Sequence, residues 1–376
     1  MEHKKLGDIA TYVNGYAFKP EDRGTKGLPI IRIQDLTGNS YDLGFYNGEY
    51  PKKIELNNGD ILISWSASLG VYEWNRGKAL LNQHIFKAVF DKLDVNKKYF
   101  VFAVKYNLKE MEKRTHGATM KHITKKDFDN VLVPFPPLNK QQEIAATLDK
   151  LQSIITHRRT QLEKLDLLVK ARFVEMFGEP ILNEKGWNMV TIGDIVTEVK
   201  YGTSKPAVEG GKYPYLRMNN LTYDGHLDLT NLKMIDIPDS EIEKCIVHRG
   251  DVLFNRTNSI ELVGKTCVFD KDEDMVIAGY IIRVRLKSIM LPIVLSYFMN
   301  TDALKKKLRN MAKGAVNQAN INAQEFKSIN IYLPPIELQT QFADFVKQVD
   351  KSRVAIQNDL EQAQMLFDSL MQEYFG

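Results

Sequence analysis

The sequence predicts an α+β protein of two similar globular domains in pseudo-two-fold arrangement, joined by two long helices that pair as an antiparallel coiled coil. The first observation behind this prediction is an internal repeat. Residues 136–178 align without a gap to residues 334–376, at a constant spacing of 198. Solenoid units run about 20 to 50 residues, so this spacing indicates a duplicated module.

The second observation is a pattern of short apolar strands separated by Gly, Asn and Asp. In the first domain the expected strands cover 28–33, 60–64 and 84–90, and in the second they cover 215–218, 251–255 and 280–286. Each domain also contains one basic stretch with helical character, 98–114 or 291–313. Since no strand–helix–strand alternation appears, we expect mostly antiparallel sheet.

The third observation is a heptad pattern after each Pro-Pro pair. Apolar residues alternate four and three apart, as in a coiled coil, and the expected seam positions are Leu148, Leu151, Ile155, Leu162, Leu165, Val169, Val346, Val349, Ile356, Leu360, Phe367 and Leu370. About 40 residues of helix correspond to about 60 Å. The predicted boundaries are 1–137, 138–178, 179–335 and 336–376. An alternative is that these helices pack on the globular domains.

Composition narrows the class of protein. The chain has 376 residues, 44% of them hydrophobic, and a net charge of only +4. Cys245 and Cys267 are the only cysteines, too few for a disulfide framework or a cysteine-rich metal site, so we expect a reducing, cytoplasmic setting. The longest apolar run, 289–299, is shorter than the roughly 18 residues that a membrane span needs. No membrane contact is expected.

The sequence lacks the motifs of several enzymes. The two Pro-Pro pairs read Phe-Pro-Pro-Leu and Leu-Pro-Pro-Ile, neither of which is the Asn/Asp-Pro-Pro-aromatic tetrapeptide of an amino-methyltransferase. Gly264-Lys265-Thr266 lacks the earlier glycine of a phosphate-binding loop. His116 and His122 have no further ligand cluster around them. We therefore expect no catalytic site, no metal site and no bound cofactor in this chain.

Polar loops recur at matching places in the two domains. They cover 14–19 and 201–206, 32–35 and 217–220, 64–68 and 255–259, and 117–121 and 314–320. Basic residues precede the fourth loop in both domains, among them Lys109 in the first and Lys305 in the second. Asn, Gln, Arg and Ser can match base edges in the major groove, and lysines suit phosphate contacts.

These loops supply the candidate DNA contacts. In the first domain they are Tyr16, Lys19, Arg32, Gln34, Ser64, Trp65, Ser66, Gln83, His84, Lys113, Arg114, Thr119 and Lys121. In the second they are Thr203, Ser204, Lys205, Arg217, Asn219, Asn255, Arg256, Thr257, Asn258, Tyr280, Lys313, Asn317, Gln318 and Asn320. Equivalent loops that carry different residues are what a bipartite, asymmetric double-stranded DNA target requires.

With these features the chain resembles the specificity subunit of type I restriction-modification systems. The resemblance covers essentially the whole chain, and its motifs are moderately specific singly but strong in their order within the duplicated plan. The residues that carry it are 14–18, 29–33, 59–64, 136–138, 141–144, 177–180 and 183–187 in the first half, and 202–206, 251–258 and 317–322 in the second.

The resemblance implies two target-recognition domains joined by two helices, in a subunit that binds DNA and catalyses nothing. It also implies two adenine methyltransferase subunits, which bring S-adenosylmethionine, and restriction subunits that use ATP and Mg. Two alternatives remain at this point: a stand-alone two-domain DNA-binding adaptor, and a diverged nuclease. A purely structural coiled-coil scaffold would not need paired but divergent polar loops.

Overall fold

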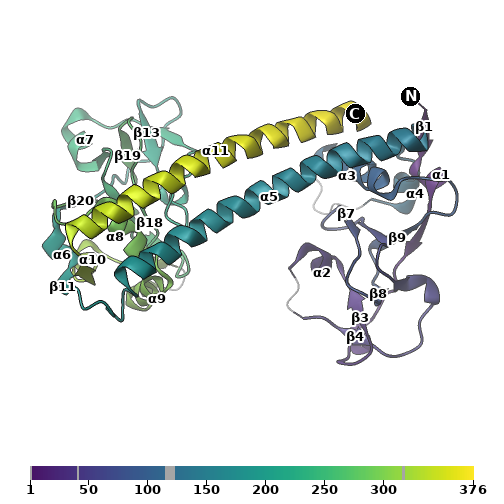
Figure 1. Ribbon diagram of the computed structural model, residues 1–376, viewed down its shortest axis with the longest axis horizontal. Coiled ribbons are helices and arrows are strands. Elements are labelled where there is room, and N and C mark those ends of the chain that lie inside the picture. The colour runs from purple at the N-terminus through teal and green to yellow at the C-terminus, as the bar shows by residue number, and fades with distance from the viewer. Residues whose placement is uncertain (1, 40–41, 115–122, 316–317) are drawn as a thin grey trace. The chain divides into compact units, whose positions relative to one another are not determined.

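The computed structural model describes residues 2–39, 42–114, 123–315 and 318–376, and the chain divides into two compact units. Unit 1 comprises Met1–Arg159 and Gln357–Gly376, and unit 2 comprises Thr160–Ile356. Each unit therefore holds one globular domain together with part of each long helix (Figure 1).

Unit 1 contains two four-stranded sheets and a two-stranded ribbon. The first sheet has the order β2-β9-β6-β7 and is antiparallel throughout, whereas the second, β4-β3-β8-β5, has one parallel pair, β3 with β8. The ribbon pairs β1 with β10. The strands are β1 His3–Lys5, β2 Thr11–Asn14, β3 Leu28–Ile31, β4 Phe45–Tyr46, β5 Glu55–Leu56, β6 Ile61–Ser64, β7 Gly70–Glu73, β8 Ala79–Leu81, β9 Ile85–Val89 and β10 Leu132–Pro134.

Helices cover and connect these sheets. They are α1 Leu6–Ile9, η1 Pro20–Asp22, α2 Ile33–Thr37, η2 Lys52–Ile54, α3 Lys97–Arg114 and α4 Lys125–Asp129. Tyr99 and Phe100 of α3 and Phe128 of α4 join Tyr12 and Phe86 of the first sheet in one buried cluster. A smaller buried cluster joins the second sheet to Leu62 and Ile85 of the first sheet.

Unit 2 repeats this plan with additions. Its sheets β12-β20-β16-β18 and β14-β13-β19-β15 correspond to those of unit 1, including one parallel pair, β13 with β19, and β11 pairs with β23. A three-stranded sheet, β17-β22-β21, has no counterpart among the described residues of unit 1. The strands are β11 Asn188–Thr191, β12 Val196–Tyr201, β13 Tyr213–Leu216, β14 Lys233–Ile235, β15 Ile246–Val247, β16 Val252–Asn255, β17 Thr257–Asn258, β18 Thr266–Val268, β19 Met275–Ile277, β20 Ile281–Leu286, β21 Lys313–Ala315, β22 Gln318–Asn320 and β23 Asn330–Leu333.

The helices of unit 2 correct one prediction. They are α6 Ile192–Ile195, η3 Met218–Asn220, α7 Asp239–Cys245, α8 Pro292–Met299, α9 Asp302–Met311 and α10 Ala323–Lys327. The single helical stretch expected over 291–313 is thus two helices that end at Met311. The break lies at Asn300, whose buried side-chain amide donates to the Thr266 carbonyl at 2.6 Å and to the Ser296 carbonyl at 2.9 Å.

The two long helices are α5 Leu138–Phe177 and α11 Ile336–Phe375, each of 40 residues. A buried glutamine fixes the start of each helix. Gln141 Nε2 donates to the Pro136 carbonyl at 2.9 Å and its Oε1 accepts the Asn96 N–H at 3.0 Å. Gln339 does the same with Pro334 and Leu291, at 2.8 Å each. Both helices are therefore anchored to the preceding α3 or α8 region.

Within each unit α5 and α11 run antiparallel. In unit 1 Arg158 pairs with Asp359 at 2.9 Å, and in unit 2 Asp166 pairs with Arg353 at 2.6 Å. The predicted antiparallel pairing of the two long helices is confirmed, and all twelve predicted seam residues are buried or half-buried.

The helices also pack on the domains, so the two alternatives for them are not exclusive. Leu148 and Ile155 belong to the buried cluster of unit 1 and Val169 to that of unit 2. Phe367 meets Phe102 of α3 edge-on, with ring centroids 6.0 Å apart. Free rods would leave these faces in water, whereas burying them on the domains removes that apolar surface from solvent.

Candidate nucleic-acid interface

Three of the predicted polar loops of unit 1 meet through backbone hydrogen bonds. These hydrogen bonds join the segments that follow β2, β3 and β6 to the segment between β8 and β9. The bonds are Tyr16 N–H to Leu81 O at 2.9 Å, Gln83 N–H to Tyr16 O at 2.9 Å, Asn82 N–H to Ile31 O at 3.0 Å and Trp65 N–H to His84 O at 3.3 Å. The segment 82–84 is therefore the hub of this loop frame.

Unit 2 builds the same loop frame at the equivalent positions. Its bonds are Thr203 N–H to Ile277 O at 2.9 Å, Gly279 N–H to Thr203 O at 2.7 Å, Ala278 N–H to Leu216 O at 2.9 Å and Arg256 N–H to Tyr280 O at 2.9 Å. Another shared bond ties the end of the fourth loop to the third, from Ile123 N–H to Trp65 O at 3.0 Å and from Ile321 N–H to Arg256 O at 2.9 Å. Backbone bonds do not depend on side-chain identity, so the frame tolerates different side chains in the two units.

A glycine in each unit lets the first loop approach the hub. A Cβ on Gly15 would lie 1.9 Å from the Asn82 carbonyl oxygen, and one on Gly202 would lie 2.1 Å from that of Ile277. Real Cβ atoms do not come this close to backbone, so only glycine fits without moving the loop. The glycines at 15 and 202 therefore belong to the frame itself.

In unit 2 the loop frame surrounds a cavity of 510 Å³, which we call the unit 2 reading cavity. It is lined by Thr203, Ser204, Lys205, Pro206, Ala207, Tyr215, Arg217, Met218, Asn219, Arg256, Ala278, Gly279 and Tyr280. Seven of these were predicted to contact DNA from sequence, in four separate segments, and the structure brings them together. Ser204, Asn219 and Tyr280 are exposed.

The cations of the unit 2 reading cavity differ in their neutralisation. Lys205 forms an ion pair with Glu241 at 2.9 Å. Arg256 lies over the Tyr201 ring, 4.9 Å from its centroid, and its guanidinium donates a long hydrogen bond, 3.4 Å, to the Gly279 carbonyl. Arg217 donates from Nη2 to the Asn231 carbonyl at 3.2 Å. Among the described residues neither arginine has a carboxylate partner.

Unit 1 carries different side chains on the same frame. Trp65 stands where unit 2 has Arg256; its ring stacks on Phe86 and meets His84 edge-on, with centroids 5.5 and 5.0 Å away. Arg32, the counterpart of Arg217, pairs with Asp35 at 3.1 Å and with Asp42 at 3.5 Å. Tyr16, Lys19, Gln34 and His84 are exposed, whereas Ser66 and Gln83 are half-buried.

Three predicted contact residues are buried instead, which corrects their assignment. Ser64 and Asn255 are fully buried and Thr257 is 5% exposed. Ser64 Oγ donates to the Ser68 carbonyl at 2.5 Å, and Asn255 Nδ2 donates to the Thr257 and Tyr280 carbonyls at 3.1 Å each. Thr257 Oγ1 bonds to Asn320 Oδ1 at 2.9 Å. The polar atoms of these side chains already have hydrogen-bond partners within the protein. The side chains therefore stabilise the loops rather than contact DNA.

Two lysines are also buried. Lys305 lies 3.5 Å from the Tyr223 ring centroid and donates to the Tyr223 carbonyl, and burial, with the nearby charge of Lys170, lowers its pKa to about 8. Lys305 is therefore not the phosphate contact predicted for it. Lys265 donates to the Met218 carbonyl at 2.6 Å and directly precedes β18 rather than a helix, so Gly264-Lys265-Thr266 is no phosphate loop.

The remaining candidates are placed in part. Asn258 and Asn320 are half-buried beside the third loop. Lys113 and Arg114 lie on α3, Lys313 on β21 and Gln318 on β22, but their side chains are outside the description. Thr119, Lys121, Asn317, His116 and His122 lie outside the described residues altogether.

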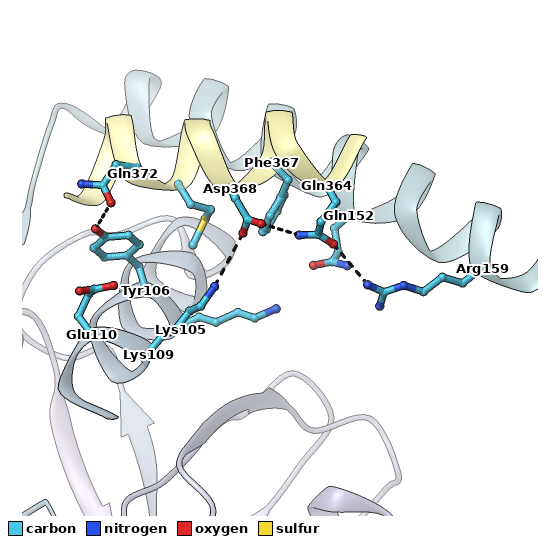
Figure 2. A pocket seen from close by; sticks show the side chains of 11 residues that line it. Lys105, Tyr106, Lys109, Glu110, Gln152, Arg159, Gln364, Phe367, Asp368 and Gln372 are labelled. Carbon is cyan, nitrogen blue, oxygen red and sulfur yellow. Dashed lines mark hydrogen bonds and ion pairs between the residues drawn. The ribbon is translucent and has the colours of Figure 1, made fainter. Parts of the chain in front are cut away.

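A second cavity, of 480 Å³, lies in unit 1 between α3, α5 and α11 (Figure 2). Its polar side chains pair largely with one another: Lys109 with Asp368 at 3.9 Å, Tyr106 with Gln372 at 2.7 Å and Arg159 with Gln364 at 3.3 Å. Burial, followed by the charges of Lys109 and Arg159, lowers the pKa of Lys105. None of the loop-frame residues lines this cavity, so it belongs to the helix packing and not to the candidate interface.

Among the described residues no cluster of three His, Cys, Asp or Glu side chains is arranged to hold a metal, and no helix is long and apolar enough to cross a membrane. Tyr201 and Tyr215, which support Arg256 and the first loop, were not among the residues predicted from the sequence. Nor was the change from Asp35 to Asn220, which removes the carboxylate beside the equivalent arginine; this signal was present in the aligned loops.

Known proteins share this sequence pattern and this architecture. The chain is 25% identical to the type I restriction enzyme EcoKI specificity subunit of Escherichia coli (strain K12), over 98% of this chain and 87% of that protein. It is 24% identical to the EcoBI specificity subunit of Escherichia coli, over 98% and 84%. The crystal structure of a type I restriction-modification S subunit from M. genitalium has the same fold, with a TM-score of 0.59 at 15% identity, over 100% of this chain and 96% of that one.

The family model covers nearly the whole chain. The type I restriction modification DNA specificity domain matches residues 1–165 and again residues 184–363, in step with the duplication found in the sequence and in the two units. The chain belongs to the type I restriction-modification DNA specificity family and is a DNA sequence-specificity subunit.

Proposed function

We propose that this subunit reads a bipartite, asymmetric DNA target, with unit 1 on one half-site and unit 2 on the other, and that its paired helices set the unread gap. The observation that carries the proposal is the loop frame. Its backbone hydrogen bonds are the same in both units, while the side chains mounted on it differ, with Trp65 and His84 in one and Arg256 and Tyr280 in the other. Equal frames with unequal readers suit two different half-sites.

The proposal extends to partners. Two adenine methyltransferase subunits would dock on this chain, because the helix segments 136–178 and 334–376 repeat each other more closely than the domains do and offer one partner two similar sequences. Restriction subunits would complete the assembly. S-adenosylmethionine, ATP and Mg would be bound by those partners, and this chain would recognise DNA without catalysing a reaction.

The test is to co-express the chain with the methyltransferase encoded beside it and to map N6-methyladenine across the host genome by single-molecule sequencing. A split motif with a fixed unread gap, present only with this chain, is the expected result. A well-formed complex that adds no methylation, or that modifies a continuous motif, would contradict the proposal. Cleavage of DNA by the isolated chain with Mg would favour the nuclease alternative instead.

A further inference from the structure

Two equivalent arginines in the two units have different electrostatic surroundings. In unit 1 Arg32 lies against Asp35 and Asp42, at 3.1 and 3.5 Å, and its charge is offset within the unit. In unit 2 the residue equivalent to Asp35 is Asn220, whose Oδ1 accepts the backbone N–H of Arg217 at 2.9 Å but brings no charge. Arg217 is thus a cation of the unit 2 reading cavity that no described carboxylate neutralises.

The second cation of this cavity is Arg256, and its neighbours fix the orientation of its side chain. Its backbone is fixed on both sides by bonds to Tyr280 and Ile321, both at 2.9 Å, and its guanidinium lies over the Tyr201 ring. Tyr201 is itself fixed, because its hydroxyl accepts the Ala323 N–H at 2.8 Å. The Nε atoms of Arg256 and Arg217 are buried without a hydrogen-bond partner among the described residues, so the fork-shaped donors of both side chains are mostly unused.

The chemistry of this cavity selects among the bases. Guanine presents two acceptors, O6 and N7, to the major groove, and a guanidinium is the usual bidentate donor to them. Adenine presents one acceptor and one donor, which an amide matches better. Phosphates also accept hydrogen bonds from arginine. A phosphate contact, however, does not need a guanidinium that an aromatic ring orients inside a cavity formed by four segments of the chain.

We propose, on the basis of the proposed function, that the unit 2 reading cavity takes the major-groove edge of a guanine, with Arg256 as the specificity-determining residue and Arg217 as the second cation. The half-site read by unit 2 then contains a guanine that Arg256 requires. Unit 1 has no equivalent requirement, because Trp65 replaces Arg256 and Arg32 is neutralised. The asymmetry of the DNA target would follow from these two replacements.

The test maps N6-methyladenine for the full complex with wild-type chain, Arg256→Lys and Arg256→Gln. Lysine keeps the charge but loses the fork, and glutamine favours adenine. We expect both variants to lose preference for one guanine by about 5- to 150-fold, Arg256→Gln to gain tolerance for adenine there, and the other half-site to stay unchanged. Arg217→Lys should weaken the same half-site. Arg249→Lys is the matched control, since this exposed arginine pairs with Asp272 at 2.8 Å outside the cavity.

The source of the acceptors is tested with oligonucleotides in which that guanine is replaced by 7-deazaguanine. Wild-type complex should bind the modified DNA less tightly, whereas Arg256→Gln should not distinguish the two. A half-site with adenine in place of guanine, read through Asn219, would overturn the inference. So would an unchanged motif in Arg256→Lys together with a uniform loss of affinity in Arg256→Gln, which would mark a phosphate contact. A wild-type chain without any split motif would instead reject the proposed function; a split motif that Arg256 variants leave intact rejects only this inference.

Discussion

At the scale of single residues, a buried glutamine at the start of each long helix holds two peptide groups that would otherwise lack partners. Gln141 is 1% exposed and Gln339 is fully buried. Each is at once a donor to the first carbonyl of a Pro-Pro pair and an acceptor for the N–H of the residue just before α3 or α8, which are helices earlier in the chain. This explains why glutamine, rather than an apolar residue, recurs at a buried position of the repeat.

The first prediction concerns this glutamine. Gln141→Leu keeps the volume but leaves the buried Pro136 carbonyl and the half-buried Asn96 N–H unpaired, so it should lower the free energy of unfolding of unit 1 by about 1–3 kcal/mol. Urea unfolding followed by far-ultraviolet circular dichroism measures the change. Gln142→Leu is the matched control, because Gln142 is the exposed neighbour. Equal stability of the two variants would show that the buried hydrogen bonds contribute nothing.

The second prediction concerns the pH dependence of unit 2. The pKa of Lys305 falls from 10.5 to about 8 on folding, so the unfolded chain binds more protons between these values and stability should rise with pH across this window. The gain is at most about 3 kcal/mol. Lys305→Met removes this pH-dependent contribution to the free energy of unfolding, so wild type should gain stability relative to this variant from pH 7.5 to pH 10.

Thermal unfolding of wild type, Lys305→Met and Lys306→Met at several pH values in this range is the measurement. Lys306 is an exposed lysine of the same helix, and its variant should follow wild type. A constant difference between wild type and Lys305→Met at all pH values would contradict the burial of the charged amine. The outcome also bears on DNA contact, because an amine enclosed by Tyr223 is not available to phosphates.

Polar residues also mark the limit of sequence reasoning at this scale. The sequence identified Arg256, Arg217, Asn219 and Tyr280 as candidates, and the structure gathers them in one cavity. It treated Asn255 in the same way, although its amide is consumed by two backbone carbonyls. A side chain that satisfies a loop and one that faces solvent have the same polarity, so only three-dimensional neighbours separate them.

At the scale of elements, the six predicted strands lie within two residues of their expected ranges, since Gly-Asp turns and apolar runs are local signals, whereas the other strands were not predicted. The strand expected over 28–33 ends at Ile31 because Arg32 caps a helix: its N–H donates to Asp35 at 2.8 Å. The division of α8 from α9 depends on the contact of Asn300 with Thr266, 34 residues away. Such long-range contacts leave no periodic pattern in the sequence.

The third prediction concerns the register of α5 against α11. The Asp166–Arg353 pair is more buried than the Arg158–Asp359 pair, with side chains 28% and 22% exposed against 34% and 52%. A double-mutant cycle with Asp166→Asn and Arg353→Gln should give a coupling of about 1–2 kcal/mol. The equivalent cycle at Arg158 and Asp359 should give about 0.2–1 kcal/mol. Equal coupling energies would show that burial does not strengthen the Asp166–Arg353 pair.

At the scale of the whole molecule, duplication separates what is shared from what differs. The backbone loop frame and the glutamine at each helix start are repeated in both units. The side chains on the frame differ, and so do the extra strands β17, β21 and β22 of unit 2. Exchange of one domain for another of the family should therefore change one half-site and leave the assembly intact.

The last prediction tests whether the helices set the unread gap. Insertion of one heptad after Thr160 and one after Gln357 preserves the apolar seam and lengthens both helices by about 10 Å, which corresponds to about three base pairs of DNA. The methylation motif of the complex should then keep both half-sites and gain a gap longer by about three base pairs. Insertion of seven residues after Glu273, in an exposed turn of unit 2, is the control and should leave the gap unchanged. A gap that stays constant in the heptad variant would show that DNA flexibility, not helix length, fixes the spacing, and a changed half-site would show that the helices also take part in base recognition.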